Sequence, residues 1–79
     1  MPRLLQVSGA EVARLVESLG YRFLRQRGSH ARYALTTQVG THNITSPMHR
    51  TIAKGTLNDI LNRVRLRTGV PKPRLIDRI

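Results

Sequence analysis

The chain lacks cysteine altogether, has little acidic charge and contains no long hydrophobic run. Without cysteine, neither a disulfide nor a cysteine-ligated zinc ion can stabilise the fold, and a cytoplasmic location is permitted. The N-terminal segment lacks the apolar stretch of a signal peptide, and no segment is long enough to cross a bilayer. A chain of 79 residues is therefore expected to form a single domain over 1–79, whose modest core depends on side-chain packing alone.

The charge that is present has one dominant sign. Lysine and arginine together number 14 against four aspartate and glutamate residues, which gives a formal net charge of +10. Twelve of the 14 are arginine, whose planar guanidinium group can bind two phosphate oxygens at once. This excess predicts a polyanionic partner such as nucleic acid, with an arginine-rich coding bias as the alternative explanation.

Two segments carry apolar residues at helical spacing. In the first, Ser8 and Glu11 have the spacing of a capping box, in which each side chain binds the backbone amide of the other residue. An apolar stripe follows, and Gly20 suits a left-handed helix end, so we predict a helix over 9–19. In the second, Thr56 begins a similar capping pattern. The stripes consist of Val12, Leu15, Val16 and Leu19 in the first segment and of Leu57, Ile60, Leu61 and Val64 in the second.

Three segments between these helices have the composition of β-strands. Turns at Gly28-Ser29 and Gln38-Val39-Gly40 separate them, and Pro47 ends the last one. The sequence thus predicts an α+β fold of order α-β-β-β-α, in which two helices cover one face of a three-stranded antiparallel sheet. Residues 70–79 form either a loose tail or a short helix. The expected strands run from Tyr21 to Arg27, from Ala31 to Thr37 and from Thr41 to Ser46.

Gly28-Ser29-His30 carries the residue types of a small site that cleaves RNA without a metal ion. Such cleavage removes a proton from a 2′-hydroxyl group and gives one to the departing 5′-oxygen, and histidine can do both near neutral pH. Gly28 allows close backbone approach to a phosphate, and Ser29 can orient a phosphate oxygen. Taken alone, the tripeptide is a weak motif that also fits an ordinary polar turn.

Three nearby arginines would stabilise the charge that develops during such a reaction. Strand alternation predicts that Arg25 and Arg27 share one face if no bulge intervenes, with Arg32 pointing elsewhere.

The other histidines and a cationic loop are further candidates. His49 lies in a loop and either lines a substrate path or is simply exposed. Arg50 and Lys54 bring two cations beside the free N–H groups of the second helix, which form a natural anion site or a routine helix cap. His42 shares strand parity with Ile44 and is expected to be partly buried. Three histidines without a carboxylate cluster favour neither a metal nor another cofactor.

Five short segments follow one another in the order and spacing of a known family. They are Ser8-Gly9-x-Glu11, Leu19-Gly20-Tyr21, Arg25-Gln26-Arg27-Gly28-Ser29-His30, Ile44-Thr45-Ser46-Pro47-Met48-His49, and Gly55-Thr56-Leu57 followed by Ile60-Leu61. Through these segments the chain resembles the HicA family of mRNA interferase toxins over residues 8–66.

This resemblance implies a fold like that of double-stranded-RNA-binding domains and ribosome-independent cleavage of mRNA. It also implies that His30 is the catalytic residue and that a HicB-type antitoxin neutralises the protein. The chain would then be the toxin of a type II toxin-antitoxin system, an endoribonuclease acting in the cytoplasm. The expected RNA-binding residues are Arg25, Arg27, Gly28, Ser29, Arg32, His49, Arg50 and Lys54.

Three positions depart from the usual pattern of the family. Ala31 stands where many relatives have a second histidine, which leaves His30 as the single acid/base candidate in the hairpin. Arg65 stands where many relatives end the second helix with glycine, so this helix is expected to continue toward Gly69. Ser46 replaces a usual aliphatic residue, which suggests looser packing nearby.

Two other functions fit the same composition. A non-catalytic RNA-binding module of the same fold would hold a duplex by its shape and its phosphates. A degenerate toxin would bind its antitoxin and leave RNA intact. His30 distinguishes these possibilities, because a nuclease depends on this imidazole and a binding module gains little from it.

Overall fold

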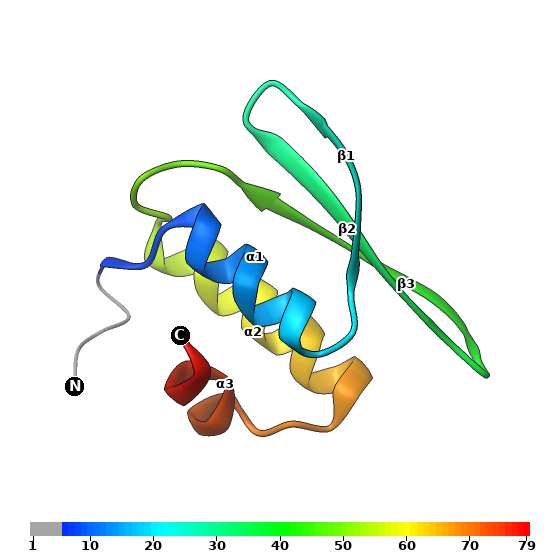
Figure 1. The fold of residues 1–79 in the computed structure, drawn as a ribbon. Coiled ribbons are helices and arrows are strands. Elements are labelled where there is room, and N and C mark those ends of the chain that lie inside the picture. The colour runs from blue at the N-terminus through cyan, green and yellow to red at the C-terminus, as the bar shows by residue number, and fades with distance from the viewer. Residues whose placement is uncertain (1–5) are drawn as a thin grey trace.

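The structure is a computed structural model that describes residues 6–79, so the N-terminal segment considered above for a signal peptide lies mostly outside it. The element order is α-β-β-β-α-α, and both long helices lie on one side of a three-stranded antiparallel sheet (Figure 1). The predicted α+β fold is confirmed, with one further helix after it. The elements are α1 (Gly9–Ser18), β1 (Arg22–Arg27), β2 (His30–Thr37), β3 (Gly40–Pro47), α2 (Lys54–Thr68) and α3 (Lys72–Arg78).

Helix α1 begins with the predicted capping box. The backbone amide of Glu11 donates to Ser8 Oγ at 3.1 Å, and the backbone amide of Ser8 donates to Glu11 Oε1 at 2.9 Å. The helix ends one residue before the predicted position. Gly20 follows with a φ of 103°, a backbone conformation that glycine adopts without strain. Local signals in the sequence therefore define both ends of this helix.

The three strands form the predicted meander in the order β1-β2-β3. Two-residue turns join them, the first between Arg27 and His30, which pair with each other across the hairpin. Gly28 in this turn has a φ of 55°, and a positive φ at this position matches the twist of the flanking strands. β1 begins one residue later than predicted, β3 is one residue longer at each end, and β2 begins one residue earlier, so His30 is the first residue of β2 and not part of the turn.

Helix α2 begins two residues earlier than the predicted cap at Thr56. Its first residue is Lys54, and no side chain among the described residues caps it. The predicted capping pattern fails because it lies inside the helix, where Asp59 forms an i,i+4 ion pair with Arg63 at 3.0 Å. The other end agrees with the prediction, since the helix continues to Gly69, whose φ is 79°.

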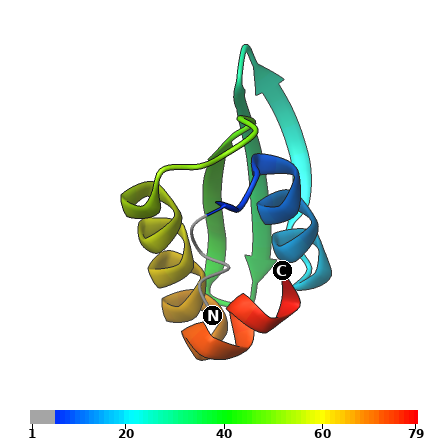
Figure 2. The same ribbon diagram turned by 90° about the vertical axis from the view of Figure 1, so that its left-hand side faces the viewer.

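Residues 70–79, for which the sequence leaves two forms open, contain α3. Figures 1 and 2 show α3 lying across α1 and α2 on the side away from the sheet. Leu75 is fully buried there, and Arg78 Nη1 donates to Ser18 Oγ at 3.3 Å. The core thus lies between the sheet and the two long helices and is closed by α3. Both predicted stripes contribute to it, with Leu19 only partly buried, and its sheet side includes Ala31, Tyr33 and Ile44.

Candidate functional site

The end of the β1–β2 hairpin presents His30 to solvent. Gly28 and Ser29 are the two turn residues, and His30 follows them with an exposed side chain. Gln26 Nε2 donates to the carbonyl oxygen of Gly28 at 3.0 Å and braces the turn. Because β2 is the central strand, pairing on both sides fixes the backbone that carries this imidazole.

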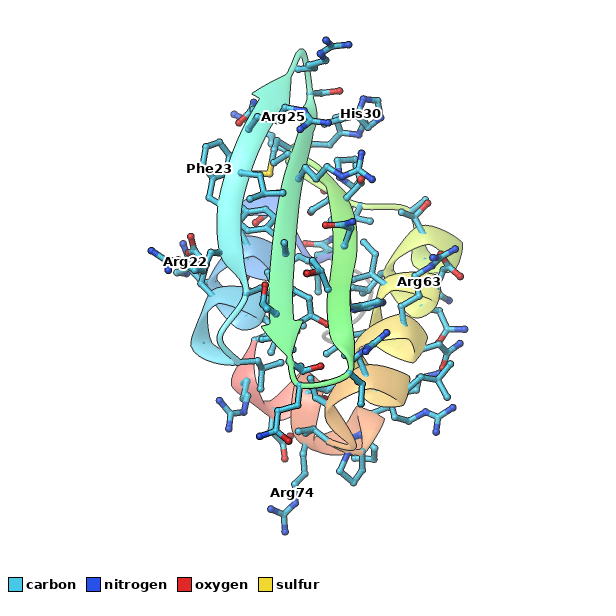
Figure 3. All side chains as sticks on the ribbon, turned by 90° about the vertical axis from the view of Figure 1, so that its right-hand side faces the viewer. Arg22, Phe23, Arg25, His30, Arg63 and Arg74 are labelled. Atoms are coloured by element: carbon cyan, nitrogen blue, oxygen red, sulfur yellow. The ribbon has the colours of Figure 1, made fainter. Side chains whose placement is uncertain are left out.

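Three arginines share the face of the sheet that carries His30. In antiparallel strands, residues opposite each other point to the same side, and Arg25 lies opposite Arg32 while Arg27 lies opposite His30. All four lie on the surface away from α1 and α2, which we call the open face. Figure 3 views this face, with Arg25 and His30 near the turn. In the described part of the chain, no carboxylate lies within ion-pair distance of these arginines.

A β-bulge in β1 sets the direction of these side chains. Phe23 packs edge-on against Tyr33 on the helix-covered side, with ring centroids 5.7 Å apart. Strict alternation would put Arg25 on that same side. However, the register shifts between Phe23 and Arg25, and a bulge redirects the residues that follow it.

The expectation that Arg32 points away from Arg25 is therefore wrong. The bulge turns Arg25 and Arg27 toward the open face together, and Arg32 lies directly opposite Arg25. Like charges opposite each other destabilise a sheet. Arg25 and Arg32 lie opposite each other with no carboxylate nearby among the described residues, which favours an anionic ligand on the open face.

A groove of about 300 Å³ extends from the open face around the edge of β3 to α2. Arg32 lines it from the sheet, and Arg63, visible beside β3 in Figure 3, lines it from the helix. Arg63 is missing from the residues expected from the sequence, because helical spacing does not show which side of a helix lies against a strand edge. Asp59 also lines this groove and pairs with Arg63 at 3.0 Å, so Arg32 is the guanidinium group there that has no carboxylate within ion-pair distance among the described residues.

The second exposed histidine lies against the hairpin turn. His49 Nε2 lies 3.3 Å from Ser29 Oγ, within hydrogen-bond distance, although the two residues are 20 positions apart. The backbone joins the same two segments, because the amide of Met48 donates to the carbonyl oxygen of Ser29. Arg50 follows in the exposed loop that leads to α2. The structure therefore brings His49 to the turn that carries His30.

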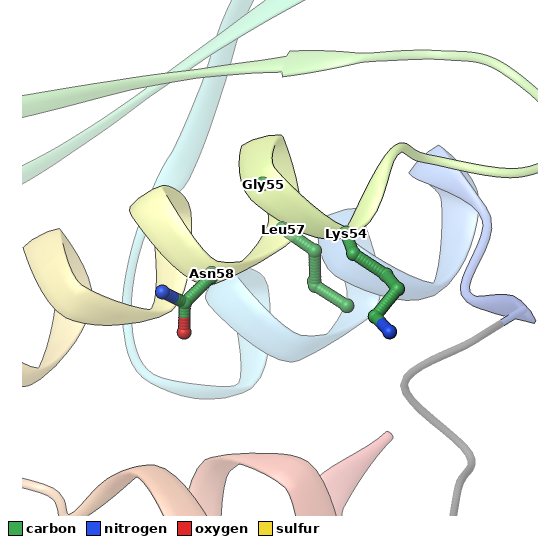
Figure 4. Close-up of a pocket in the computed structure, with 4 residues that line it drawn as sticks. All are labelled: Lys54, Gly55, Leu57 and Asn58. Carbon is green, nitrogen blue, oxygen red and sulfur yellow. The ribbon is translucent and has the colours of Figure 1, made fainter.

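The start of α2 lies apart from this group. Lys54 lines a pocket of about 320 Å³ together with Gly55, Leu57 and Asn58, and its side chain points away from the strands (Figure 4). Lys54, which the sequence predicts to bind RNA, thus has a side chain directed away from the open face.

One protein family matches most of this chain. Residues 9–66 match the family described as HicA toxin of bacterial toxin-antitoxin. The chain belongs to the HicA toxin family. The match spans α1, the whole sheet and most of α2, and it ends before α3. This HicA chain is therefore a toxin whose family implies an antitoxin partner. A search of curated proteins gave no match.

The third histidine of the HicA chain has a structural role. His42 is half-buried on the helix-covered side of β3, as predicted, and its Nδ1 lies 2.7 Å from the hydroxyl oxygen of Tyr21. Burial lowers the pKa of His42, and the positive charges of Arg67 and Arg63 lower it further. Burial also raises the pKa of the Tyr21 hydroxyl group. Both effects favour a neutral Tyr21–His42 pair.

Residues 6–79 of this HicA chain were compared with the requirements of a metal site and of a membrane span. No three His, Cys, Asp or Glu side chains among residues 6–79 lie close enough together to hold a metal ion. Over the same range, none of the helices combines the length and the apolar character needed to cross a membrane.

Proposed function

We propose that this HicA toxin is an endoribonuclease that cleaves mRNA in the cytoplasm without a metal ion, with His30 as a general acid/base. Cleavage joins the 2′-oxygen to phosphorus and breaks the bond from phosphorus to the 5′-oxygen. One proton must leave the 2′-hydroxyl group, and one must reach the 5′-oxygen. An imidazole can transfer either proton near neutral pH.

The main support for this proposal is that His30 and the three arginines lie on the same face of the sheet. Arg27 lies opposite His30, and the Arg25–Arg32 pair lies two residues further, about 7 Å along the strands. Opposed guanidinium groups can bind the non-bridging oxygens of one phosphate and stabilise the charge that develops on them. A phosphate held there lies within reach of the exposed imidazole.

The hairpin turn and the loop before α2 complete the proposed RNA-binding surface. No atom lies within 4 Å of the place where a Cβ of Gly28 would be, so a phosphate can approach this backbone. Ser29 and His49 supply a hydroxyl group and an imidazole beside it, and Arg50 supplies an exposed cation. Lys54 would contact a more distant phosphate from α2, since it points away from the open face.

Incubation of the purified protein with a long mRNA in EDTA tests the proposal. We expect the wild type to cleave the RNA. His30→Ala should bind RNA without cleaving it and should unfold at the wild-type temperature, because His30 is exposed. His42→Gln removes a histidine from the opposite side of the sheet and is the matched control, which should cleave like the wild type.

Cleavage by His30→Ala at the wild-type rate, or inhibition of the wild type by EDTA, would contradict the proposal. A wild type that binds RNA and never cleaves it would identify a non-catalytic RNA-binding module instead.

We further propose that a HicB-type antitoxin covers the open face. Its acidic side chains would pair with arginines that have no carboxylate partner in the described structure, which gives rapid, salt-sensitive association. Hydrogen exchange of the complex should show protection of the backbone amides over 28–33 and 48–49. Protection confined to α3, with RNA access to His30 unchanged, would contradict direct masking.

A further inference from the structure

We infer that His49 is a second catalytic residue, which shares the two proton transfers of RNA cleavage with His30. This inference rests on the proposed endoribonuclease function and goes beyond it, because it divides the acid and base roles between two imidazoles. It also goes beyond the RNA-binding role expected for His49 from the sequence.

Side-chain geometry brings the second imidazole to the turn. His49 Nε2 lies 3.3 Å from Ser29 Oγ, and Ser29 is the residue directly before His30. The pairing of β2 with β3 places Pro47 opposite His30, two residues before His49. Both imidazoles are exposed to solvent, so both can reach an RNA strand that lies over the turn.

The backbone holds the 47–49 segment from both sides. On one side, the amide of Met48 donates to the carbonyl oxygen of Ser29. On the other side, the amide of Gly9 at the start of α1 donates to the carbonyl oxygen of His49 at 2.9 Å. These two hydrogen bonds hold the backbone that carries His49, and catalytic groups need a fixed position.

Gly9 is the residue that allows this arrangement. A Cβ at this position would lie 2.7 Å from the Cα of Met48 and would also overlap the carbonyl oxygen of Pro47. The start of α1 therefore packs directly on the backbone of the 47–49 segment. The capping box fixes the start of α1. Together with the contact at Gly9, it holds His49 in place relative to the hairpin turn.

The chemistry gives the second imidazole a task. The attacking 2′-oxygen and the departing 5′-oxygen lie on opposite sides of phosphorus, so one imidazole cannot easily serve both at the same moment. A neutral imidazole takes the proton of the 2′-hydroxyl group as the new oxygen–phosphorus bond forms. A protonated imidazole gives its proton to the 5′-oxygen as the old bond breaks. The two rings exchange protonation states in each cleavage, and proton exchange with water restores them.

Position 31, where many relatives have their second histidine, does not offer this geometry in the present chain. Ala31 is fully buried on the helix-covered side of the sheet, opposite to the direction of His30. A side chain in that direction would be separated from the open face by the sheet itself. His49 reaches the turn from the adjoining loop and remains exposed.

The pH dependence of cleavage of a short RNA tests the inference. The wild type should show a bell-shaped profile of kcat, because one imidazole must be protonated and the other neutral. His49→Gln should lower kcat roughly 10² to 10⁴-fold, leave KM nearly unchanged and remove one limb of the profile. His42→Gln, which removes a histidine outside the site, should retain both limbs. A His49→Gln enzyme that keeps both limbs, or changes KM alone, would overturn the inference.

A substrate with sulfur in place of the 5′-oxygen then assigns the two roles. A thiolate leaves without receiving a proton, so the variant that lacks the general acid should regain the rate and the variant that lacks the base should not. We therefore expect rescue of either His30→Ala or His49→Gln, but not of both. Rescue of both variants or of neither would overturn the division of roles. If His30→Ala alone is inactive and His49→Gln behaves as the wild type, the proposed function stands and this inference fails.

Discussion

The two faces of the sheet are built from alternate residues of the same strands and have opposite properties. The covered face packs Ala31, Tyr33 and Ile44 against two apolar helix stripes. The open face carries an arginine pair directly across from each other without a carboxylate partner in the described chain. Burial of apolar surface is favourable, and the opposition of like charges is unfavourable. The covered face therefore supplies the stability that the open face requires in order to present cations to a ligand.

The two faces should differ most clearly in how much stability is lost when a large side chain is replaced by alanine. Leu15 and Leu61 are each about 1% exposed, so Leu15→Ala or Leu61→Ala should lower the free energy of unfolding by about 2 to 5 kcal/mol. On the open face, Arg25→Ala should change it by no more than about 0.5 kcal/mol. Urea denaturation measures both. Equal losses from the two faces would show that the open face also holds the fold together.

A matched pair of glycine substitutions tests the contact between the covered side and the site. Gly9→Ala places a Cβ against the backbone of Met48 and should lower stability by about 1 to 3 kcal/mol, with a loss of cleavage as His49 shifts. Gly55→Ala meets no atom within 4 Å and should raise stability by about 0.4 to 1 kcal/mol. Thermal unfolding and cleavage assays of both variants check this. A Gly9→Ala protein as stable and as active as the wild type would contradict the close approach.

RNA binding should depend on the open face through its charge. With His30→Ala as the binding form, a further Arg32→Ala change should reduce the slope of log K against log salt by about one unit for duplex RNA. A change of one unit in this slope means that a tenfold rise in salt concentration weakens binding by a factor of ten less, which is about 1.4 kcal/mol of binding free energy. Arg74→Ala, on α3 away from the sheet, is the control and should leave the slope nearly unchanged. The same change in both variants would indicate dependence on net charge alone.

One residue on the covered face breaks its apolar pattern. Ser46 is fully buried, and its Oγ has no hydrogen-bond partner among residues 6–79. Because an unsatisfied buried hydroxyl group is unfavourable, Ser46→Ala should raise stability by about 1 kcal/mol. Thr45→Ser on the exposed side of the same strand should have little effect. A loss of stability in Ser46→Ala, measured by urea denaturation, would mean that this hydroxyl group is satisfied.

The smallest expected effect concerns pH. The pKa of His42 is lowered in the folded protein, so its contribution to stability is present above the unfolded pKa of about 6.5 and declines as pH falls below it. His42→Gln should therefore reduce the loss of thermal stability between pH 7.5 and 5. Parallel melting profiles of the variant and the wild type would show that His42 does not contribute to this loss.

The sequence predicts those parts of the fold that depend on local signals. The capping box at Ser8, the two apolar stripes and the glycine of the first turn define the elements, and the structure confirms their order. The start of α2 is mispredicted because the Thr56 pattern resembles a cap, although Asp59 is used in an ion pair along the helix.

The candidate site is less predictable because its geometry depends on contacts between distant segments. A single extra residue in β1 determines which side Arg25 faces, and no motif marks a bulge. The contact between Ser29 and His49 joins positions 20 residues apart. The sequence names these residues as candidates, but only the folded chain shows that Arg32 and His49 join His30 while Lys54 does not.

The docking of α1 on the 47–49 segment also has a consequence for the synthesis of the toxin. Gly9 and His49 are bonded across 40 positions of the chain, and such contacts form only after the intervening chain is available. A nascent chain that has not yet emerged to position 49 lacks the segment on which α1 docks, and with it the arrangement proposed for cleavage. On this mechanism the ribosome never carries an active toxin at an early stage of translation. Activity begins when the whole surface that an antitoxin could recognise is also present.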